Sequence, residues 1–157
     1  MYHFFSEHEH IHDTYIDIVG SDVNHIKNVL RLKTGDSLLI SSGDNIDYTC
    51  HIAQIDEEHI RADIDSVDER GRELASKIYL FQGLPKADKM ELVIQKAVEL
   101  GAFEVIPVAM KRSVVKLDAK KAESKVKRWN AIAESAAKQS KRSILPQVSD
   151  VDRKSVV

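Results

Sequence analysis

The chain has 157 residues, of which 43% are hydrophobic and 31% are charged, and its formal net charge is −2. This length suits one ordinary domain or two small ones. No apolar run approaches the roughly 20 residues that a membrane-spanning helix needs. The first residues lack the basic stretch and apolar core of a signal peptide, and Cys50 is the single cysteine. We therefore expect a cytoplasmic protein with no disulfide within the chain.

The small net charge conceals a strong asymmetry along the chain. Residues 1–110 hold 10 Lys and Arg against 20 Asp and Glu, whereas residues 111–157 hold 13 against 5. A basic C-terminal part indicates contact with a polyanion. A solvated helix rich in lysine would give the same counts, so both interpretations stay open at this point.

The first 66 residues have the pattern of a small β-barrel. Short alternating or apolar runs, bounded by Gly, Asp and Asn, fall at residues 16–18, 38–40, 46–55 and 60–64. Several short strands at close spacing are typical of such barrels. One helix interrupts them, with Ser21 as its expected cap. Its apolar stripe consists of Val23, Ile26, Val29 and Leu30. The charged residues 67–76 are predicted to form a linker.

After the linker the pattern changes to that of an α/β unit. The continuous apolar runs 78–81 and 105–109 predict buried strands, and the helix of about 14 residues between them ends at Gly101. The two strands should therefore be parallel. A long helix is expected over 118–141, and a third strand should begin at Ile144-Leu145. Three strands and two helices would leave one face or edge of the sheet uncovered, to be completed by more chain or another subunit.

Lys86 and Lys89 mark a candidate anion site at the turn between the first of these strands and its helix. Helix N-termini attract phosphate, and lysines placed there oppose the helix dipole unless a ligand is bound. The alternative is that they are ordinary surface lysines. Lys111, Arg112 and Ser113 directly follow the next buried strand, where α/β sheets place their ligands, and a guanidinium suits phosphate or nucleobase oxygens.

The long helix carries many lysines and arginines, which superficially indicates an RNA-binding face. Trp129 falls on its apolar stripe, so we expect this indole in the core. Gln139 and Arg142, near the helix end, could reach a base edge or the RNA backbone, or could simply cap and pair. Lys96 and Glu99 are three residues apart on the preceding helix and are expected to pair.

Metal binding is disfavoured, although His8, His10 and His12 alternate and would share one face of a strand. A second cluster with ligand spacing is missing from the sequence. Cys50 lies in an alternating stretch and is interpreted as a strand residue rather than a catalytic thiol. The sequence contains none of the common nucleotide-binding or nucleophile motifs.

Many short motifs, in one order along almost the whole chain, resemble the ribosomal RNA small subunit methyltransferase E family. In the first half, His25 is followed by residues 29–33 and Gly35-Asp36. In the second half the matches are Leu84-Pro85-Lys86, 88–91, Gln95-Lys96, 99–101, Ile106-Pro107, 112–114, Arg128-Trp129, Ile132-Ala133, Gln139-Ser140, Arg142 and Pro146.

The resemblance implies an α+β two-domain protein. An RNA-binding PUA-like β-barrel would span residues 1–70, and the first part of an α/β SPOUT-type (trefoil-knot) methyltransferase domain would span residues 77–157. It also implies a homodimer that uses S-adenosylmethionine to methylate N3 of a uridine in 16S rRNA of the small ribosomal subunit. The expectations of a cytoplasmic protein with no metal and no membrane come from the sequence features above.

The chain departs from the family pattern at several positions. Ala87 replaces a glycine, Lys111 replaces an acidic residue, and Ser135 and Lys138 replace glutamates. The sequence also stops at Val157, before the family's Gly-Pro-Glu-Gly-Gly-like segment and knot. We therefore expect the S-adenosylmethionine site to lie beyond Val157 and this chain alone to be inactive.

Loss of the N3 proton places negative charge on O2 and O4 of the uridine, where a cation lowers the barrier. Arg112 is our candidate catalytic residue for that role or for clamping a phosphate. The expected RNA contacts are Arg31, Lys86, Lys89, Gln139 and Arg142. No general base is identified. Two alternatives remain: a non-catalytic RNA-binding module, and an interaction domain whose sheet pairs with another subunit.

Overall fold

The computed structural model describes residues 1–86, 88–111 and 117–153. The chain divides into two compact units, Met1–Glu73 and Leu74–Val157, called unit 1 and unit 2 below. Across the described ranges, no helix combines the length and the apolar character needed to cross a bilayer. The α+β fold class predicted from the sequence is confirmed.

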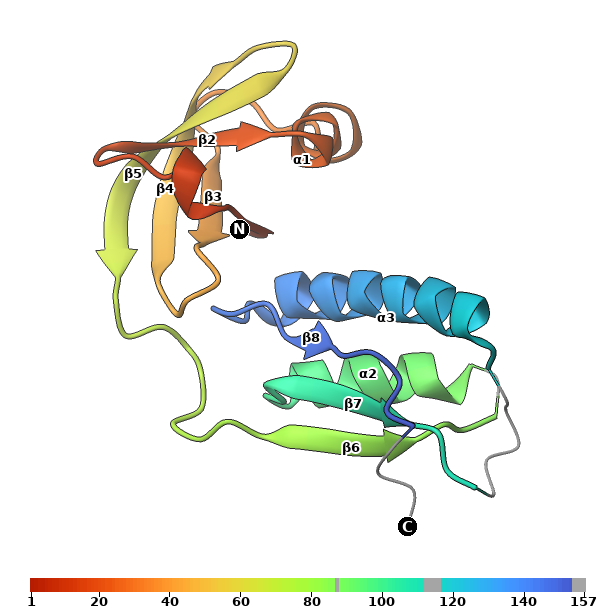
Figure 1. Ribbon diagram of the computed structural model, residues 1–157. Coiled ribbons are helices and arrows are strands. Elements are labelled where there is room, and N and C mark those ends of the chain that lie inside the picture. The colour runs from red at the N-terminus through yellow and green to blue at the C-terminus, as the bar shows by residue number, and fades with distance from the viewer. Residues whose placement is uncertain (87, 112–116, 154–157) are drawn as a thin grey trace. The chain divides into compact units, whose positions relative to one another are not determined.

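Unit 1 is built on a five-stranded mixed sheet (Figure 1). Its strands are β1 (Tyr2–Phe5), β2 (Tyr15–Val19), β3 (Ser37–Ser41), β4 (Asp47–Ile55) and β5 (His59–Asp68), in the order β1-β3-β4-β5-β2. β1 pairs with β3 in parallel, and the other pairs are antiparallel. Since β5 continues to Asp68, the linker predicted at residue 67 begins later than expected.

The helical segments of unit 1 differ from the predicted single helix. A 3₁₀ turn, η1 (His8–His10), follows β1, while α1 (Ser21–Asn24) passes directly into the π-helical η2 (His25–Leu30). Gly20 occupies the N-cap position expected for Ser21. Val23 and Ile26 are buried as predicted, but Val29 is 64% exposed. The wider winding of a π-helix turns Val29 away from the stripe that α-helical spacing assigned to it.

The core of unit 1 comes from alternating strand residues and the helical turn. Its buried members are Phe4, Ile16, Ile18, Val23, Ile26, Leu38, Ile40, Cys50, Ile52, Ile60 and Ala62. Cys50 is fully buried on β4, and burial raises the pKa of its thiol to about 12. Its interpretation as a structural strand residue is therefore confirmed.

Unit 2 contains the predicted β-α-β arrangement. β6 (Tyr79–Gly83), α2 (Lys89–Glu99) and β7 (Glu104–Val108) follow one another, and the two strands are parallel. α3 (Ala119–Ser140) then leads to β8 (Gln147–Val148), which pairs in parallel with β7. The third strand therefore begins after Pro146 rather than at Ile144, since proline has no N–H to give a strand ladder.

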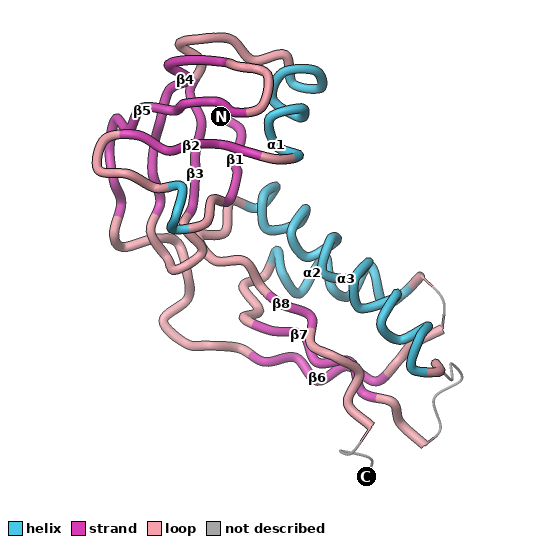
Figure 2. Tube along the Cα trace, turned by 45° about the horizontal axis from the view of Figure 1, so that its top comes forward, coloured by secondary structure: helices cyan, strands magenta, loops and turns pink. Residues whose placement is uncertain are grey.

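Both helices of unit 2 lie on one face of the sheet β6-β7-β8 (Figures 1 and 2). Val105 and Val148, which are paired in the ladder, are buried on that face. The opposite face carries Tyr79, 47% exposed, and Phe81, 62% exposed. The described part of unit 2 thus leaves one sheet face open, as the sequence predicted.

Local signals account for the ends of both helices. Gly101 has φ +102° and closes α2, where a side chain would be strained. The Asp118 side chain caps α3 by accepting a hydrogen bond from the Lys121 amide at 2.8 Å. Trp129 is only 4% exposed, which confirms its predicted place in the core.

Candidate functional site

The carboxyl ends of the three parallel strands meet at one edge of unit 2, the edge at which α2 begins. The Leu84 amide donates to the Val108 carbonyl at 3.0 Å, which joins the residue after β6 to the end of β7. The Ala109 amide donates to the Asp152 carbonyl at 2.9 Å, which joins the residues beyond β7 and β8. In open α/β sheets, ligands bind at this edge.

Lys86 and Lys89 lie at this edge, as the sequence predicted. Lys86 is exposed in the turn after β6, and Lys89 is the first residue of α2 and also exposed. The N-cap residue, Asp88, makes no side-chain hydrogen bond to the helix N-terminus. An anion can therefore reach both the N-terminal amides and two ammonium groups.

A pocket of about 200 Å³ opens between the turn after β6 and the first half of α3. Its lining is mainly apolar, with one acidic and one basic side chain. The lining residues are Leu84, Pro85, Met90, Glu91, Leu117, Lys125 and Trp129. The pocket thus places an ammonium group beside an apolar wall at the ligand-binding edge of the sheet.

The charge of this pocket is set by an ion pair that joins its two helices. The Arg128 guanidinium donates from Nε to Glu91 Oε1 at 2.5 Å and from Nη2 to Oε2 at 3.0 Å. These hydrogen bonds, with the positive charges of Arg128 and Lys125, hold the pKa of Glu91 below its ordinary value. The lowered pKa makes the Glu91 carboxylate a weak base, and both of its oxygens already accept from Arg128, so Glu91 does not suit the role of a general base.

Gln139 and Arg142 lie at the other end of unit 2. Gln139 is exposed near the end of α3. Arg142 is buried, and its Nη1 donates to the carbonyls of Val98 at 2.8 Å and Ala102 at 3.0 Å, at the end of α2. α2 has 11 residues and is about 16 Å long, so these residues are well separated from Lys86 and Lys89. The burial of Arg142 favours the structural alternative that the sequence left open.

The remaining predicted site residues belong to other parts of the chain. Arg31 is exposed at the C-cap of η2 in unit 1, and its φ of 55° is left-handed, which is uncommon for a residue other than glycine. Arg112 lies outside the described residues. Lys96 Nζ and Glu99 Oε2 are 2.7 Å apart, which confirms their predicted pairing.

The three alternating histidines do not share a strand face, because His8 and His10 lie in the 3₁₀ turn η1. Each instead approaches a carboxylate: His8 that of Asp44 at 3.4 Å, His10 that of Glu9 at 3.5 Å, and His12 that of Asp17 at 3.3 Å. Glu7, Glu9 and His10 each bring one possible ligand atom within 4.8 Å of the others. Both glutamates are exposed, so we assign these residues no metal.

Sequence reasoning missed the pocket and the pair of Glu91 and Arg128 that borders it. The two residues are 37 positions apart, and no local spacing connects them. The sequence does mark both residues, because each lies in a motif that matches the family. Glu91 is the last residue of the match at 88–91, and Arg128 directly precedes the buried Trp129.

Two family models match the chain. One, described as an RNA methyltransferase domain, covers residues 72–155, and the other, described as an RNA methyltransferase PUA domain, covers residues 18–65. These two matches lie largely in unit 2 and unit 1, respectively.

Two curated relatives are named as ribosomal RNA small subunit methyltransferases E. Ribosomal RNA small subunit methyltransferase E from Bacillus subtilis is 43% identical over 134 residues, which are 85% of this chain and 52% of the relative. Ribosomal RNA small subunit methyltransferase E 2 from Borreliella burgdorferi is 32% identical over 126 residues, which are 80% of this chain and 51% of the relative. The chain spans about half the length of these relatives.

A solved structure shares the fold. The crystal structure of a ribosomal RNA small subunit methyltransferase E from Neisseria gonorrhoeae, bound to S-adenosyl methionine, superposes with a TM-score of 0.85 at 27% identity. The match covers 98% of this chain and 62% of that one.

Proposed function

The chain belongs to the ribosomal RNA small subunit methyltransferase E family, and on this premise we propose that it serves S-adenosylmethionine-dependent methylation of N3 of a uridine in 16S rRNA. We also propose that it acts on the small ribosomal subunit, in the cytoplasm and as a homodimer. The observation that carries the proposal is the family match over residues 72–155, the part of the chain that holds the basic strand edge.

The geometry of that edge supports RNA as the substrate. Lys86 and Lys89 stand exposed at the N-terminus of α2, beside an apolar pocket that also presents Lys125. Cations around an apolar recess suit a nucleic acid, because phosphates bind the charges and an unstacked base can enter the recess. Gln139 and Arg31 are the other exposed residues proposed to contact RNA. Arg142 is left out because its guanidinium is occupied within the fold.

The proposed chemistry needs stabilisation of negative charge. Methylation at N3 removes the imide proton, and the charge then spreads over O2 and O4. Arg112, which comes shortly after β7 in the sequence, is proposed to meet this charge or to clamp a phosphate. A general base is not assigned, since the lowered pKa of Glu91 makes it a weak base and Arg128 occupies its carboxylate.

The methyl donor does not suit the described pocket. S-adenosylmethionine would supply the methyl group from a sulfonium cation, but among the described lining residues the one carboxylate is that of Glu91, which Arg128 occupies. Lys125 adds a repelling positive charge. We therefore propose that the donor binds outside the described residues.

A chimera tests the proposal. Residues 1–157 joined to the remaining C-terminal part of the Bacillus subtilis relative should transfer labelled methyl groups to 30S subunits that lack this modification, and Arg112→Ala should slow the transfer by about two orders of magnitude. A chimera that folds and binds the donor but leaves 16S rRNA unmodified contradicts the proposed function.

RNA binding is tested on the chain alone. Lys86→Ala and Lys89→Ala should each weaken binding to a 16S rRNA fragment and reduce the slope of log affinity against log salt by about 0.7. Lys77→Ala, which removes an exposed lysine just before β6, is the matched control. Equal effects at all three positions would argue against a site at the strand edge.

A second candidate function is an RNA-binding module without methyl transfer. The exposed lysines at the strand edge, Lys86 and Lys89, support it, because contact with RNA phosphates needs no methyl donor. In that case the chain binds the RNA fragment with the affinity of the chimera, and the chimera transfers no methyl group.

A further inference from the structure

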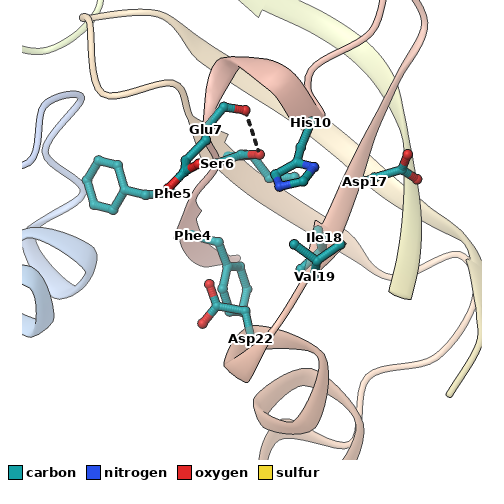
Figure 3. A pocket seen from close by; sticks show the side chains of 10 residues that line it. Phe4, Phe5, Ser6, Glu7, His10, Asp17, Ile18, Val19 and Asp22 are labelled. Carbon is teal, nitrogen blue, oxygen red and sulfur yellow. Dashed lines mark hydrogen bonds between the residues drawn. The ribbon is translucent and has the colours of Figure 1, made fainter. Parts of the chain in front are cut away.

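Unit 1 has a pocket of its own, of about 200 Å³, which the proposed methylation does not use (Figure 3). It lies between the residues that end β1 and begin η1, and those that end β2 and begin α1. The lining residues are Phe4, Phe5, Ser6, Glu7, His10, Asp17, Ile18, Val19, Asp22 and Ile40.

The floor of this pocket is apolar and firmly packed. Phe4 is 4% exposed, Ile18 is 6% exposed and Ile40 is fully buried, and all three belong to the core of unit 1. Such a floor keeps its shape and offers van der Waals contact to a hydrocarbon chain.

The rim carries negative charge. Glu7, Asp17 and Asp22 line the pocket, and none of its described lining residues is Lys or Arg. The 3₁₀ turn η1 places two lining residues, Glu7 and His10, on the same side of the rim. The His10 amide donates to the Glu7 carbonyl at 3.0 Å, and side chains three residues apart on such a turn lie on one side. The Ser6 hydroxyl also donates to the Glu7 carbonyl, at 3.4 Å (Figure 3).

The surrounding unit has the same sign. Residues 1–73 hold 16 Asp and Glu against 6 Lys and Arg. At the pocket, where Lys and Arg are missing from the described lining, this field favours a cation over a polyanion. A ligand for the pocket must therefore combine positive charge with an apolar stem.

We propose that this pocket binds an arginine side chain presented by a basic polypeptide. The methylene stem lies on the floor made by Phe4, Ile18 and Ile40. The planar guanidinium lies at the rim and donates to the carboxylates of Glu7 and Asp22. Arginine suits this rim better than lysine because its fixed fork of N–H groups can reach two carboxylates at once.

The inference separates two tasks between the units. The lysines of unit 2, together with Arg31 of unit 1, are proposed to contact RNA, whereas the pocket of unit 1 offers carboxylates to a protein. The proposal does not depend on methyl transfer, so the failure of one leaves the other standing.

The test uses the whole 157-residue chain and two short peptides, in buffer with EDTA so that no divalent metal competes at Glu7, Glu9 and His10. Acetyl-Gly-Arg-Gly-amide is titrated against ¹⁵N-labelled protein, and the citrulline peptide, which has the same shape without the charge, is the control ligand. We expect amide shifts confined to residues 4–10 and 17–22, with the arginine peptide bound at least tenfold more tightly.

Two variants test which carboxylates bind the guanidinium of the peptide. Glu7→Gln and Asp22→Asn should each weaken arginine binding by about tenfold, as expected for a hydrogen bond between charged groups. Glu69→Gln removes the same charge from an exposed position that does not line the pocket and should change the affinity less than twofold. Amide spectra of each variant report whether it is folded.

Four results overturn the proposal: no binding of the arginine peptide, equal binding of the citrulline peptide, an equal effect of Glu69→Gln, or shifts spread over the acidic surface. A short RNA that shifts the same pocket residues also overturns it, in favour of a nucleic-acid site.

Discussion

Glu91 and Arg128 join the two helices of unit 2 through two hydrogen bonds, with Nε–Oε1 at 2.5 Å and Nη2–Oε2 at 3.0 Å. The Arg128 guanidinium lowers the pKa of Glu91 in the folded protein. A carboxyl group whose pKa is lowered by folding contributes stability above its unfolded pKa, and that contribution is lost as the pH falls through the folded value.

Arg128→Ala should therefore destabilise the chain at pH 7 but have a smaller effect at low pH. The difference in free energy of unfolding between wild type and variant should narrow once the pH falls below about 4.5, the ordinary pKa of Glu91. Urea unfolding between pH 3 and pH 7 measures this difference, and Lys127→Ala is the control on the same helix. A constant difference over the range would contradict a contribution from the ion pair.

A buried polar chain in unit 1 supports a second prediction. His3 Nε2 lies 2.7 Å from the Ser41 hydroxyl, which donates to Asp47 at 2.5 Å. Because the single proton of Ser41 goes to Asp47, His3 is the donor to Ser41. Ser41→Ala removes the group between two buried partners and should cost about 1–3 kcal/mol of unfolding free energy.

Ser37→Ala, at an exposed position on the same strand, should cost less than about 0.5 kcal/mol. Denaturant midpoints of the two variants give the comparison. If Ser41→Ala proves as mild as Ser37→Ala, the polar chain does not stabilise unit 1.

Gly71 supports a third prediction, because it has both a left-handed backbone and no room for a side chain. Its φ is +60°, and an added Cβ would lie 2.5 Å from the Asn45 carbonyl oxygen. Gly20 has φ +70° but open space around it. Gly20→Ala should therefore cost about 1–3 kcal/mol, because φ 70° with ψ −140° strains a residue that has a side chain, and Gly71→Ala, which adds the overlap, should cost more.

Thermal unfolding of the two glycine variants distinguishes the cost of backbone strain from the cost of steric overlap between the added Cβ and Asn45. The melting temperature should fall further for Gly71→Ala than for Gly20→Ala. Equal losses would mean that the segment around Asn45 moves aside without cost.

The parts of the fold set by short-range patterns could be predicted from the sequence. Gly101, Asp118 and the apolar runs on either side of α2 are local signals, and the helices and strands they predict are present. The predictions from the sequence are wrong where a local feature changes the winding of a helix or the pairing of a strand. Val29 points outward because the turn before it is π-helical, and Pro146 delays β8.

The candidate site was predictable only where the chain itself brings residues together. Lys86 and Lys89 follow a strand and start a helix, so local order places them at the strand edge. The roles of Glu91 and Arg142 depend on partners 37 to 44 residues away, and burial decides between contact with RNA and contact with the fold. Periodicity carries no information about such distant contacts.

Cys50 supports a prediction about reactivity. Its thiol is fully buried, and burial raises its pKa to about 12, so almost no thiolate is present near neutral pH. A thiol reagent such as DTNB should therefore leave the native chain unmodified from pH 7 to pH 9 and modify one thiol per chain in 6 M guanidinium chloride. Rapid modification of the native chain would contradict the burial.

Arg142 supports a prediction that separates its two possible roles. Arg142 is 6% exposed, and its guanidinium donates to the carbonyls of Val98, near the end of α2, and Ala102, in the turn toward β7. Arg142→Ala leaves these carbonyls without that donor and should cost about 2–4 kcal/mol, whereas Gln139→Ala, at an exposed position, should cost little. Urea unfolding at pH 7 measures both.

RNA affinity should show the opposite order. At a temperature at which both variants are folded, as amide spectra report, Gln139→Ala should weaken binding to the 16S rRNA fragment, and Arg142→Ala should leave it within twofold of wild type. Arg142→Lys keeps the charge but replaces the fixed, planar guanidinium with a flexible ammonium group, so it should restore only part of the stability. If Arg142→Ala is as stable as wild type yet binds RNA poorly, the arginine leaves its carbonyl partners to contact RNA, and the structural role assigned to it is wrong.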